Sequence, residues 1–262
     1  MPHPPGQFDE YAQVRRIAQI VPASLKSNPL YRGVRSALLF RQSDRYRRLR
    51  QNFRHSASKD ASSYLKLTKE PRLHLGCGAN LLPGWFNTDF FPDNPAVVHL
   101  DLTDLFPFPD ASFDLVFSEH VIEHLPLAGG INMLREANRV LKPGGRIRIS
   151  TPSLPTLLAI YAEPDVPDHR RYLEWHLETW LDGSAMKTPA IVLNDFVRNW
   201  GHLLIYDPAT LSAMISDAGF KKVIDCELQR SADDRLTDLE NDTRMPEGLL
   251  ALHTMTFEAV KH

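Results

Sequence analysis

The sequence predicts an α/β fold, in which helices cover both faces of a doubly wound, mostly parallel sheet. Three observations carry this prediction. Short apolar strands alternate with helical segments from residue 71 onward, a glycine turn follows the first strand, and acids follow the next two strands. Two late strands with no helix between them predict an antiparallel last strand. The predicted fold is therefore Rossmann-like, with seven strands.

The predicted strands follow one another in order, at 71–75, 85–90, 97–101, 113–118, 146–150, 221–228 and 250–260. A helix is predicted from about residue 119, and L-K-P-G-G ends this helical run before the fifth strand. A second helix is predicted over P-A-T-L-S-A-M-I-S-D-A-G-F, with a glycine stop at Gly219.

The sequence predicts a helical, arginine-rich extension at residues 1–68, followed by a main domain at 69–262. The stretch from Tyr31 to His55 contains eight arginines and a single acid, Asp44, and its apolar residues have roughly helical spacing. Small polar residues at 56–63 predict a linker. The arginines form either a solvated helix face or a patch for phosphate groups, nucleic acid or an anionic membrane, and both readings stay open.

The composition excludes several classes of protein. A net charge of −2 over 262 residues gives no chain-wide attraction to nucleic acid, so we do not expect a nucleic-acid partner. Cys77 and Cys226 are far apart, which excludes a disulfide framework and suits a reducing cytosol. No secretory signal and no apolar stretch of membrane-spanning length are visible. We therefore expect a cytoplasmic protein without a membrane span.

A glycine turn and two acids form a candidate nucleoside site. Gly76 and Gly78 follow the first strand, and glycine lets the backbone approach a ligand closely. Asp89, which ends the second strand, is placed to accept hydrogen bonds from both ribose hydroxyls. Asp101, which ends the third strand, is placed to face an adenine amino group. The two acids favour nucleoside binding over an ordinary tight turn.

The stretch Ser118–His124 contains H-x-x-E-H, the spacing of one class of zinc peptidases. At about 100° per residue, His120, Glu123 and His124 fall on one side of the predicted helix, where they could hold a metal ion. A peptidase would need a third protein ligand and an open coordination position. It would not need the glycine turn or the strand-end acids, so the sequence argues against a peptidase.

These motifs resemble class I S-adenosylmethionine-dependent methyltransferases of the type 11-like group. The resemblance covers about residues 71–260 in register, through L-H-L-G-C-G, H-L-D, F-D-L-V-F-S-E-H-V-I-E-H-L, R-V-L-K-P-G-G and A-G-F. It extends to the bacterial predicted methyltransferases that carry P-G-W-x-N-x-D, here Pro83 to Asp89. The resemblance implies that the cofactor is S-adenosylmethionine.

The resemblance also implies which residues meet the cofactor. The glycine turn flanks the methionine part, and the acid of the second strand holds the ribose. The acid of the third strand and the residue after it meet the adenine. The serine at the end of the fourth strand lies near the amino-acid end of the cofactor. These residues are Gly76, Cys77, Gly78, Asp89, Asp101, Leu102 and Ser118.

Three features depart from the family pattern. Asn80 replaces the third glycine of G-x-G-x-G, and His74 stands where many members have an acid. Asp89 follows Gly78 by eleven residues, against about 20 in a dinucleotide-binding unit. We therefore expect the first helix to be short or replaced by a loop. This argues against NAD more than against S-adenosylmethionine, because no diphosphate must sit on a helix N-terminus.

The histidines are the candidate catalytic and metal-binding residues. In small-RNA 2′-O-methyltransferases and some quinone-ring O-methyltransferases, a similar E-H segment and a later histidine bind a divalent cation; in other members the segment is structural or orients the acceptor. The corresponding candidates here are His120, Glu123, His124 and His202, a softer set than magnesium prefers. A hydrogen bond to Asp207 or to a backbone carbonyl is the alternative role for His202.

Residues 153–200 are expected to form a helical lid over a pocket for a small-molecule or saccharide acceptor. Their aromatic residues lie beside polar side chains and suit sugar faces; packing within the lid or in a homo-oligomer interface is the alternative. We expect O-methyl transfer to a sugar or glycan hydroxyl, which needs a base or a cation to lose its proton. A small-molecule hydroxyl, a carboxylate, an RNA 2′-hydroxyl or a non-catalytic cofactor-binding module are the alternatives.

Overall fold

The computed structural model describes residues 44–181 and 186–262, with side chains from residue 54 onward. Residues 53–262 form one compact unit. Residues 1–43 lie outside the described residues, and five of the eight arginines between Tyr31 and His55 lie on helix α4. Helix α4 (Asp44–Leu67) leads into the sheet.

The linker predicted at 56–63 is wrong, because these residues belong to α4. Ser62 and Ser63 donate their hydroxyls to carbonyls four residues earlier, which lets serine remain inside a helix. Ala57 and Ala61 are buried, and small side chains allow the helix to approach its neighbours closely. The small polar residues therefore lie on the exposed face of this helix, and the two alanines lie on its buried face.

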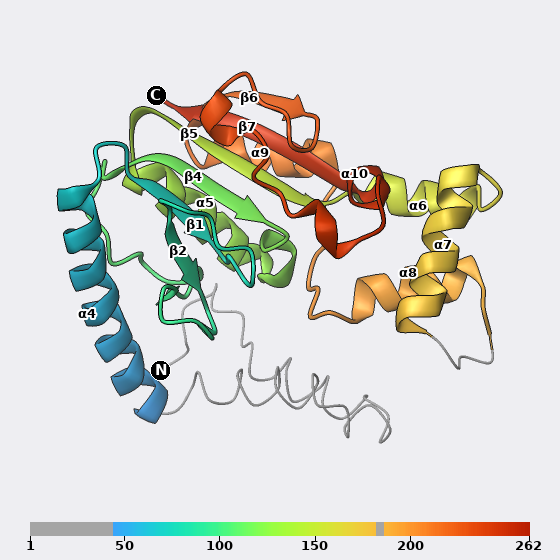
Figure 1. The fold of residues 1–262 in the computed structure, drawn as a ribbon, viewed down its shortest axis with the longest axis horizontal. Helices are drawn as coiled ribbons and strands as arrows, with labels where there is room; N and C mark the ends of the chain where they lie inside the picture. The colour runs from blue at the N-terminus through green and yellow to red at the C-terminus, as the bar shows by residue number, and fades with distance from the viewer. Residues whose placement is uncertain (1–43, 182–185) are drawn as a thin grey trace, which may run out of the picture. The chain divides into compact units, whose positions relative to one another are not determined.

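The sheet has seven strands in the described part of the chain, in the order β3-β2-β1-β4-β5-β7-β6. Strand β7 is antiparallel to its neighbours β5 and β6, and the other pairs are parallel, so the predicted fold class is confirmed (Figure 1). The strands are β1 (Arg72–Leu75), β2 (Phe86–Asp89), β3 (Val98–His99), β4 (Phe113–Glu119), β5 (Leu141–Pro152), β6 (Phe220–Cys226) and β7 (Thr254–Lys261).

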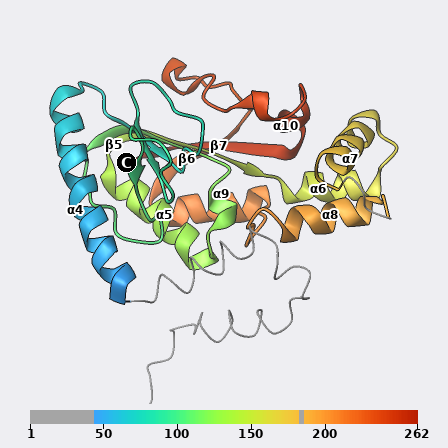
Figure 2. The same cartoon turned by 60° about the horizontal axis from the view of Figure 1, so that its bottom comes forward.

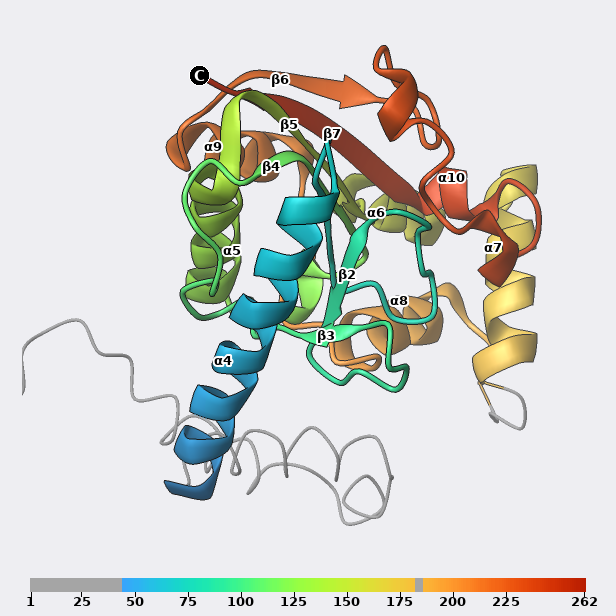
Figure 3. The same cartoon turned by 60° about the vertical axis from the view of Figure 1, so that its left-hand side comes forward.

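The two faces of the sheet are covered differently. Helices α5 (Leu127–Val140) and α9 (Pro208–Asp217) lie on one face, as Figure 2 shows. On the other face lies the segment 227–253 between β6 and β7, which we call the excursion (Figure 3). It contains the short helices η2 (Asp234–Leu236), η3 (Asp242–Arg244) and α10 (Leu249–His253). The last strand is shorter than predicted because 249–253 is helical.

The excursion supplies apolar cover that helices usually provide in doubly wound folds. Leu236 and Leu239 pack with Trp85, Leu115 and Phe117 on this face. Residues 76–85, all of them described, contain no helix, so the expected loop in place of the first helix is confirmed. The excursion therefore packs beside that loop.

The insertion after β5 is helical, as predicted. It consists of α6 (Leu154–Ala162), α7 (Pro167–Trp180) and α8 (Pro189–Arg198), which follow the carboxyl end of β5 (Figure 1). These helices have a core of their own, in which Leu157, Tyr172, Val192 and Phe196 are buried. Within the described part of the chain, no helix combines the length and apolar character needed to span a bilayer.

The helix predicted from residue 119 is wrong at its start. Strand β4 continues to Glu119, the 3-10 turn η1 spans Ile122–His124, and α5 begins only at Leu127. The reason is Pro126, because a residue before proline is driven toward extended backbone. Leu125 adopts φ −98° and ψ 143° accordingly. In the sequence, the stretch H-L-P at 124–126 indicates that the helix begins after the proline.

Candidate active site

The glycine turn follows β1, and its two glycines serve different purposes. Both have left-handed backbone, with φ +64° at Gly76 and +49° at Gly78. A Cβ added at Gly76 would lie 2.5 Å from Cγ2 of Val121, so Gly76 is needed for protein packing. A Cβ added at Gly78 would meet nothing within 4 Å. Gly78 therefore borders open space in which a ligand can approach the backbone.

Asp89 is tied to this turn. Its Oδ2 accepts a 3.0 Å hydrogen bond from the amide of Gly78, and its Oδ1 accepts a 2.8 Å bond from the amide of Phe91. In the parallel register Thr88 pairs with Leu75, so Asp89 lies one position beyond the strand pair, beside Gly76. The structure thus places the predicted ribose acid against the predicted turn.

Asp101 and Leu102 follow β3, and both are buried. Oδ1 of Asp101 accepts hydrogen bonds from the amide and the hydroxyl of Thr103, at 3.0 and 2.7 Å. The side chain of Leu102 packs in the main core, and its carbonyl accepts from the Asn132 amide at 3.0 Å. Hydrogen bonds with Thr103 and Asn132 therefore fix the chain at the predicted adenine site.

Ser118, near the end of β4, is fully buried and pairs with Leu75 of β1. Among the described residues, its Oγ has no hydrogen-bond partner. A buried hydroxyl without a partner carries a desolvation cost, which calls for an explanation. A polar atom of a ligand at this edge would supply the partner. This orphaned hydroxyl and the open space at Gly78 fit a nucleoside cofactor with an amino-acid end.

The two substituted family positions have structural partners. His74 is buried and lies 3.1 Å from Oδ1 of Asn87, whose amide group also holds the backbone at Leu82. Burial lowers the pKa of His74 to about 4, although the Asn87 hydrogen bond opposes the shift. Asn80 donates its side-chain amide to Glu119 and to the carbonyl of Leu239. Asn80 therefore joins the turn to β4 and to the excursion.

Glu123, His124 and His202 form a second cluster at the same edge. One potential ligand atom from each lies within 4.8 Å of the others. Glu123 is fully buried, and its Oε2 accepts a 3.0 Å hydrogen bond from the hydroxyl of Thr151. Among the described residues, its Oε1 makes no hydrogen bond of good geometry, although His120 Nδ1 lies 3.4 Å away. The buried oxygen thus points into a group of imidazoles.

The charge state of Glu123 follows from opposing effects. Burial disfavours the carboxylate, but the nearby imidazoles of His120 and His124 outweigh it and hold the pKa of Glu123 at about 2. Glu123 is therefore an anion at neutral pH. This suits it to bind a cation or to orient an imidazole.

His202 has a defined tautomer. Its Nδ1 lies 2.6 Å from the carbonyl oxygen of Phe196, and a carbonyl only accepts, so Nδ1 carries the proton and Nε2 has a free lone pair. Burial lowers the pKa of His202, and the hydrogen bond to Phe196 opposes that shift. The backbone-carbonyl alternative predicted for His202 is therefore found. An imidazole anchored this way is also the usual arrangement of a metal-ligating histidine.

His120 stands apart from the other three candidates. Its Nε2 lies 3.0 Å from the hydroxyl of Thr254, and its ring lies 5.5 Å from that of His253. Because η1 is not an α-helix, the predicted common face does not form, and His120 adopts left-handed backbone at φ +50°. The structure brings Glu123, His124 and His202 together and leaves His120 at the margin beside Glu123.

Sequence reasoning missed several polar residues of the site. Thr151 of β5 holds Glu123, and Arg244 of the excursion contacts Glu119. No local motif marks them, since each contact joins segments far apart in the chain. Asn80 could be singled out from the sequence, because it replaces the third glycine of the G-x-G-x-G pattern.

A family model described as a methyltransferase domain matches residues 73–149. The match begins in β1, ends in β5 and includes the turn, both strand-end acids and Glu123. The chain contains a class I S-adenosylmethionine-dependent methyltransferase domain. The resemblance to methyltransferases that the motifs indicated is thereby confirmed.

One curated protein is similar to this chain over about half of its length. The demethylmenaquinone methyltransferase of Clavibacter sepedonicus is 32% identical over 138 residues, which are 50% of this chain and 49% of that protein. The chain thus spans about half the length of the curated relative that it matches.

Among solved structures, an S-adenosylmethionine-dependent methyltransferase from Archaeoglobus fulgidus is 18% identical, with a TM-score of 0.42 over 83% of this chain and 100% of that one. A phosphoethanolamine N-methyltransferase 2 from Haemonchus contortus, in complex with S-adenosylhomocysteine, is 14% identical. Its TM-score is 0.43, over 78% of this chain and 53% of that one.

Proposed function

We propose that this chain transfers a methyl group from S-adenosylmethionine to a hydroxyl oxygen, and that Glu123, His124 and His202 help the hydroxyl to lose its proton. One observation carries the proposal: a buried carboxylate oxygen of Glu123 points toward imidazoles without a good hydrogen bond among the described residues. Such an oxygen is costly to bury unless a proton donor or a cation meets it.

S-adenosylmethionine supplies an electrophilic methyl group on a positively charged sulfur. The protein must then align the acceptor, exclude water and accept a proton. In this proposal the turn at Gly78 and the carboxylate of Asp89 hold the nucleoside, and Ser118 lies by its amino-acid end. The acceptor enters from the side of the lid, where His202 follows α8.

His202 is the best-placed base. Its lowered pKa keeps the imidazole neutral at physiological pH, and its Nδ1 bond to Phe196 leaves Nε2 as the proton acceptor. The ring of His124 lies 4.9 Å from the ring of His202, and the two face the same cluster. A neutral base beside the anion Glu123 gains stabilisation when it takes up a proton.

The same donor set fits a divalent transition-metal ion. One carboxylate and two imidazoles are ligands that such ions accept, and three protein ligands leave positions open for an acceptor oxygen. A cation bound by Glu123, His124 and His202 would lower the pKa of the acceptor hydroxyl. We therefore propose metal assistance as the alternative to His202 acting as the base, because Nε2 of His202 has one lone pair and cannot both bind the ion and accept the proton.

The acceptor we propose is a sugar or glycan hydroxyl. Of the lid aromatics, Tyr172 and Phe196 are buried in the lid core, whereas Trp180 and Trp200 are 48% and 36% exposed. The Trp180 and Trp200 rings lie 4.1 Å apart, centroid to centroid. Trp200 precedes His202 by two positions, so exposed rings lie close to the proposed base. Exposed indole rings are suited to stack on the apolar face of a sugar ring.

Transfer of a labelled methyl group tests this proposal. The full chain is incubated with labelled S-adenosylmethionine and panels of saccharides, phenols and carboxylic acids, with and without Zn²⁺, Mn²⁺ or Mg²⁺. We expect base-stable label on a saccharide hydroxyl. Transfer that a chelator lowers would assign proton loss to the ion, and transfer that a chelator leaves unchanged would assign it to His202. Label only on carboxylates or on carbon would overturn transfer to a hydroxyl, and label only on phenols would overturn the sugar acceptor.

Two matched variants check the cofactor site in the same assay. Asp89→Asn should weaken binding of S-adenosylhomocysteine about tenfold or more, because it removes a charged hydrogen-bond acceptor. Asp93→Asn, on the exposed loop after β2, should change binding less than twofold. Equal behaviour of the two variants would contradict the assignment of Asp89 to the ribose.

A further inference from the structure

Glu119 lies where the predicted amino-acid end of the cofactor would be. Leu75 of β1 pairs with Ser118 of β4, so Glu119 is level with Gly76, the first residue of the turn. Its carboxylate is buried, with a 4% exposed side chain, and accepts a 2.6 Å hydrogen bond from Nη2 of Arg244. It also accepts from the Asn80 side chain at 3.2 Å. Arg244 is thereby held beside the turn.

The backbone of the excursion reinforces this placement. The amide of Asn241 donates to both oxygens of Glu119, at 3.0 and 3.2 Å. The carbonyl of Leu239 accepts from Asn80 at 3.0 Å. The turn, the end of β4 and the excursion therefore meet at one carboxylate and one amide.

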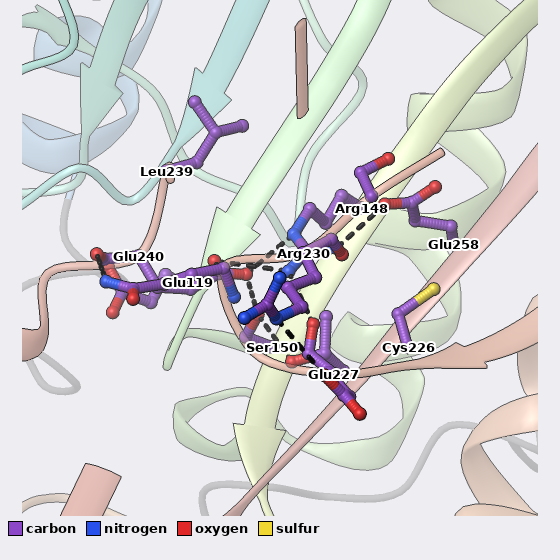
Figure 4. Close-up of polar contacts among 12 residues, drawn as sticks. Glu119, Arg148, Ser150, Cys226, Glu227, Arg230, Leu239, Glu240 and Glu258 are labelled. Carbon is purple, nitrogen blue, oxygen red and sulfur yellow. Dashed lines mark hydrogen bonds and ion pairs between the residues drawn. The ribbon is translucent and has the colours of Figure 1, made fainter. Parts of the chain in front are cut away.

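A buried ionic network fixes the excursion to the sheet, as Figure 4 shows. Arg148 of β5 is fully buried and lies 2.7 Å from both Glu240 of the excursion and Glu258 of β7. It also donates to the carbonyl oxygens of Glu227 and Arg230. This buried network therefore anchors the excursion at Glu240, four residues before Arg244.

Arg244 has unused binding capacity. A guanidinium carries five N–H donors, and within the described residues the recorded hydrogen bond of Arg244 is the one to Glu119. Its side chain is 37% exposed, whereas that of Glu119 is 4% exposed. The planar fork matches a carboxylate with two parallel hydrogen bonds. The donors of Arg244 that Glu119 does not use are therefore available next to the turn.

We propose that Arg244 binds the α-carboxylate of the cofactor and that Glu119 and Asn80 hold it in position. This inference rests on the proposed use of S-adenosylmethionine. It gives Asn80 a role: a side-chain amide at this position joins the turn to the excursion that carries the arginine. A glycine there would have no group to make this connection.

Calorimetry with two ligands tests the inference. S-adenosylhomocysteine has the amino-acid end, and 5′-methylthioadenosine lacks it. Arg244→Gln should weaken binding of S-adenosylhomocysteine about tenfold or more, because a charged hydrogen bond is lost. It should change binding of 5′-methylthioadenosine less than twofold. Glu119→Gln should show the same selectivity, since Arg244 then loses its ionic partner.

Arg230→Gln is the matched control. Arg230 lies on the same excursion and is paired with Glu227, and both side chains are 81% exposed. It should leave the binding of both ligands unchanged. An Arg244→Gln variant that binds both nucleosides as the wild type does, or that weakens both equally, would overturn this inference alone. A wild-type chain that binds neither nucleoside would overturn the proposed function, and this inference with it.

Discussion

The amide of Leu203 donates a 2.8 Å hydrogen bond to the carbonyl oxygen of Glu123. The amide of Leu204 donates to the same oxygen at 3.2 Å. These bonds bring the loop after α8 to the H-x-x-E-H segment and place His202 beside His124. The approach is close, since a Cβ at Gly201 would lie 3.6 Å from Nδ1 of His124. Backbone hydrogen bonds therefore bring the members of the cluster together.

The first prediction separates the two glycines of the turn. Gly76→Ala should lower the free energy of unfolding by about 2–4 kcal/mol, because it adds left-handed strain to a clash with Val121. Gly78→Ala adds strain without a clash, so it should cost about 1–2 kcal/mol. It should instead weaken binding of S-adenosylhomocysteine, because the new methyl group enters the open space.

Urea unfolding and calorimetry measure the two effects. Adding Val121→Ala to Gly76→Ala should recover part of the lost stability, since the clashing methyl groups are gone. The same second substitution should not restore binding to Gly78→Ala. Equal losses of stability in both single variants would contradict the division of roles.

The second prediction concerns acid stability. Burial lowers the pKa of His74 from 6.5 to about 4, so the folded chain binds this proton less readily than the unfolded chain. This group therefore leaves the free energy of unfolding at its full value above pH 6.5. The free energy of unfolding falls as the pH drops from 6.5 toward 4, because the unfolded chain then takes up the proton more readily. His74→Gln removes the titrating group and keeps a hydrogen-bond donor for Asn87. The variant should lose less free energy of unfolding than the wild type between pH 7 and 4.

Urea unfolding at pH 7, 5.5 and 4 provides the measurement. His55→Gln, on the exposed surface of α4, is the control and should follow the wild type at every pH. If His74→Gln also follows the wild type, then the buried His74 does not set the acid dependence.

The third prediction concerns the buried arginine. Arg148→Met leaves Glu240 and Glu258 buried without their cation, so the free energy of unfolding should fall by about 3–5 kcal/mol. Arg230→Gln, at an exposed position of the excursion, should change it by less than about 0.5 kcal/mol. Chemical unfolding measures both variants.

A combined variant makes the cause explicit. Adding Glu240→Gln and Glu258→Gln to Arg148→Met removes the unpaired charges and should recover part of the loss. No recovery would mean that packing of the arginine side chain, and not charge compensation, supports the excursion.

The fourth prediction concerns the proposed base. His202→Gln should reduce methyl transfer at saturating cofactor by about 100-fold or more, the usual size of a general-base effect. Binding of S-adenosylhomocysteine should stay within twofold, because His202 is assigned to the acceptor. His169→Gln is a matched control in the lid, where His169 also contacts a backbone carbonyl, that of Glu163. Comparable activity in both variants would remove His202 from the mechanism.

The succession of strands along the chain, the glycine turn and the strand-end acids could be predicted from the sequence. Each is a local pattern: an apolar run followed by Gly76, or a strand that stops at Asp89. The spacing of eleven positions from Gly78 to Asp89 correctly indicated a loop, because it leaves too few residues for a helix as well as the second strand. The predicted start of α5 was wrong, because Pro126 keeps Leu125 extended and the helix begins only at Leu127.

The tertiary structure decided which distant polar groups meet. Glu119 and Arg244 are joined only when the excursion folds back over the sheet, and Arg148 reaches Glu240 by the same path. Charge and spacing along the chain carry no record of these pairs, since each depends on the direction in which a side chain leaves a strand. Local periodicity thus specified the scaffold and its turn, and long-range packing specified the charges around them.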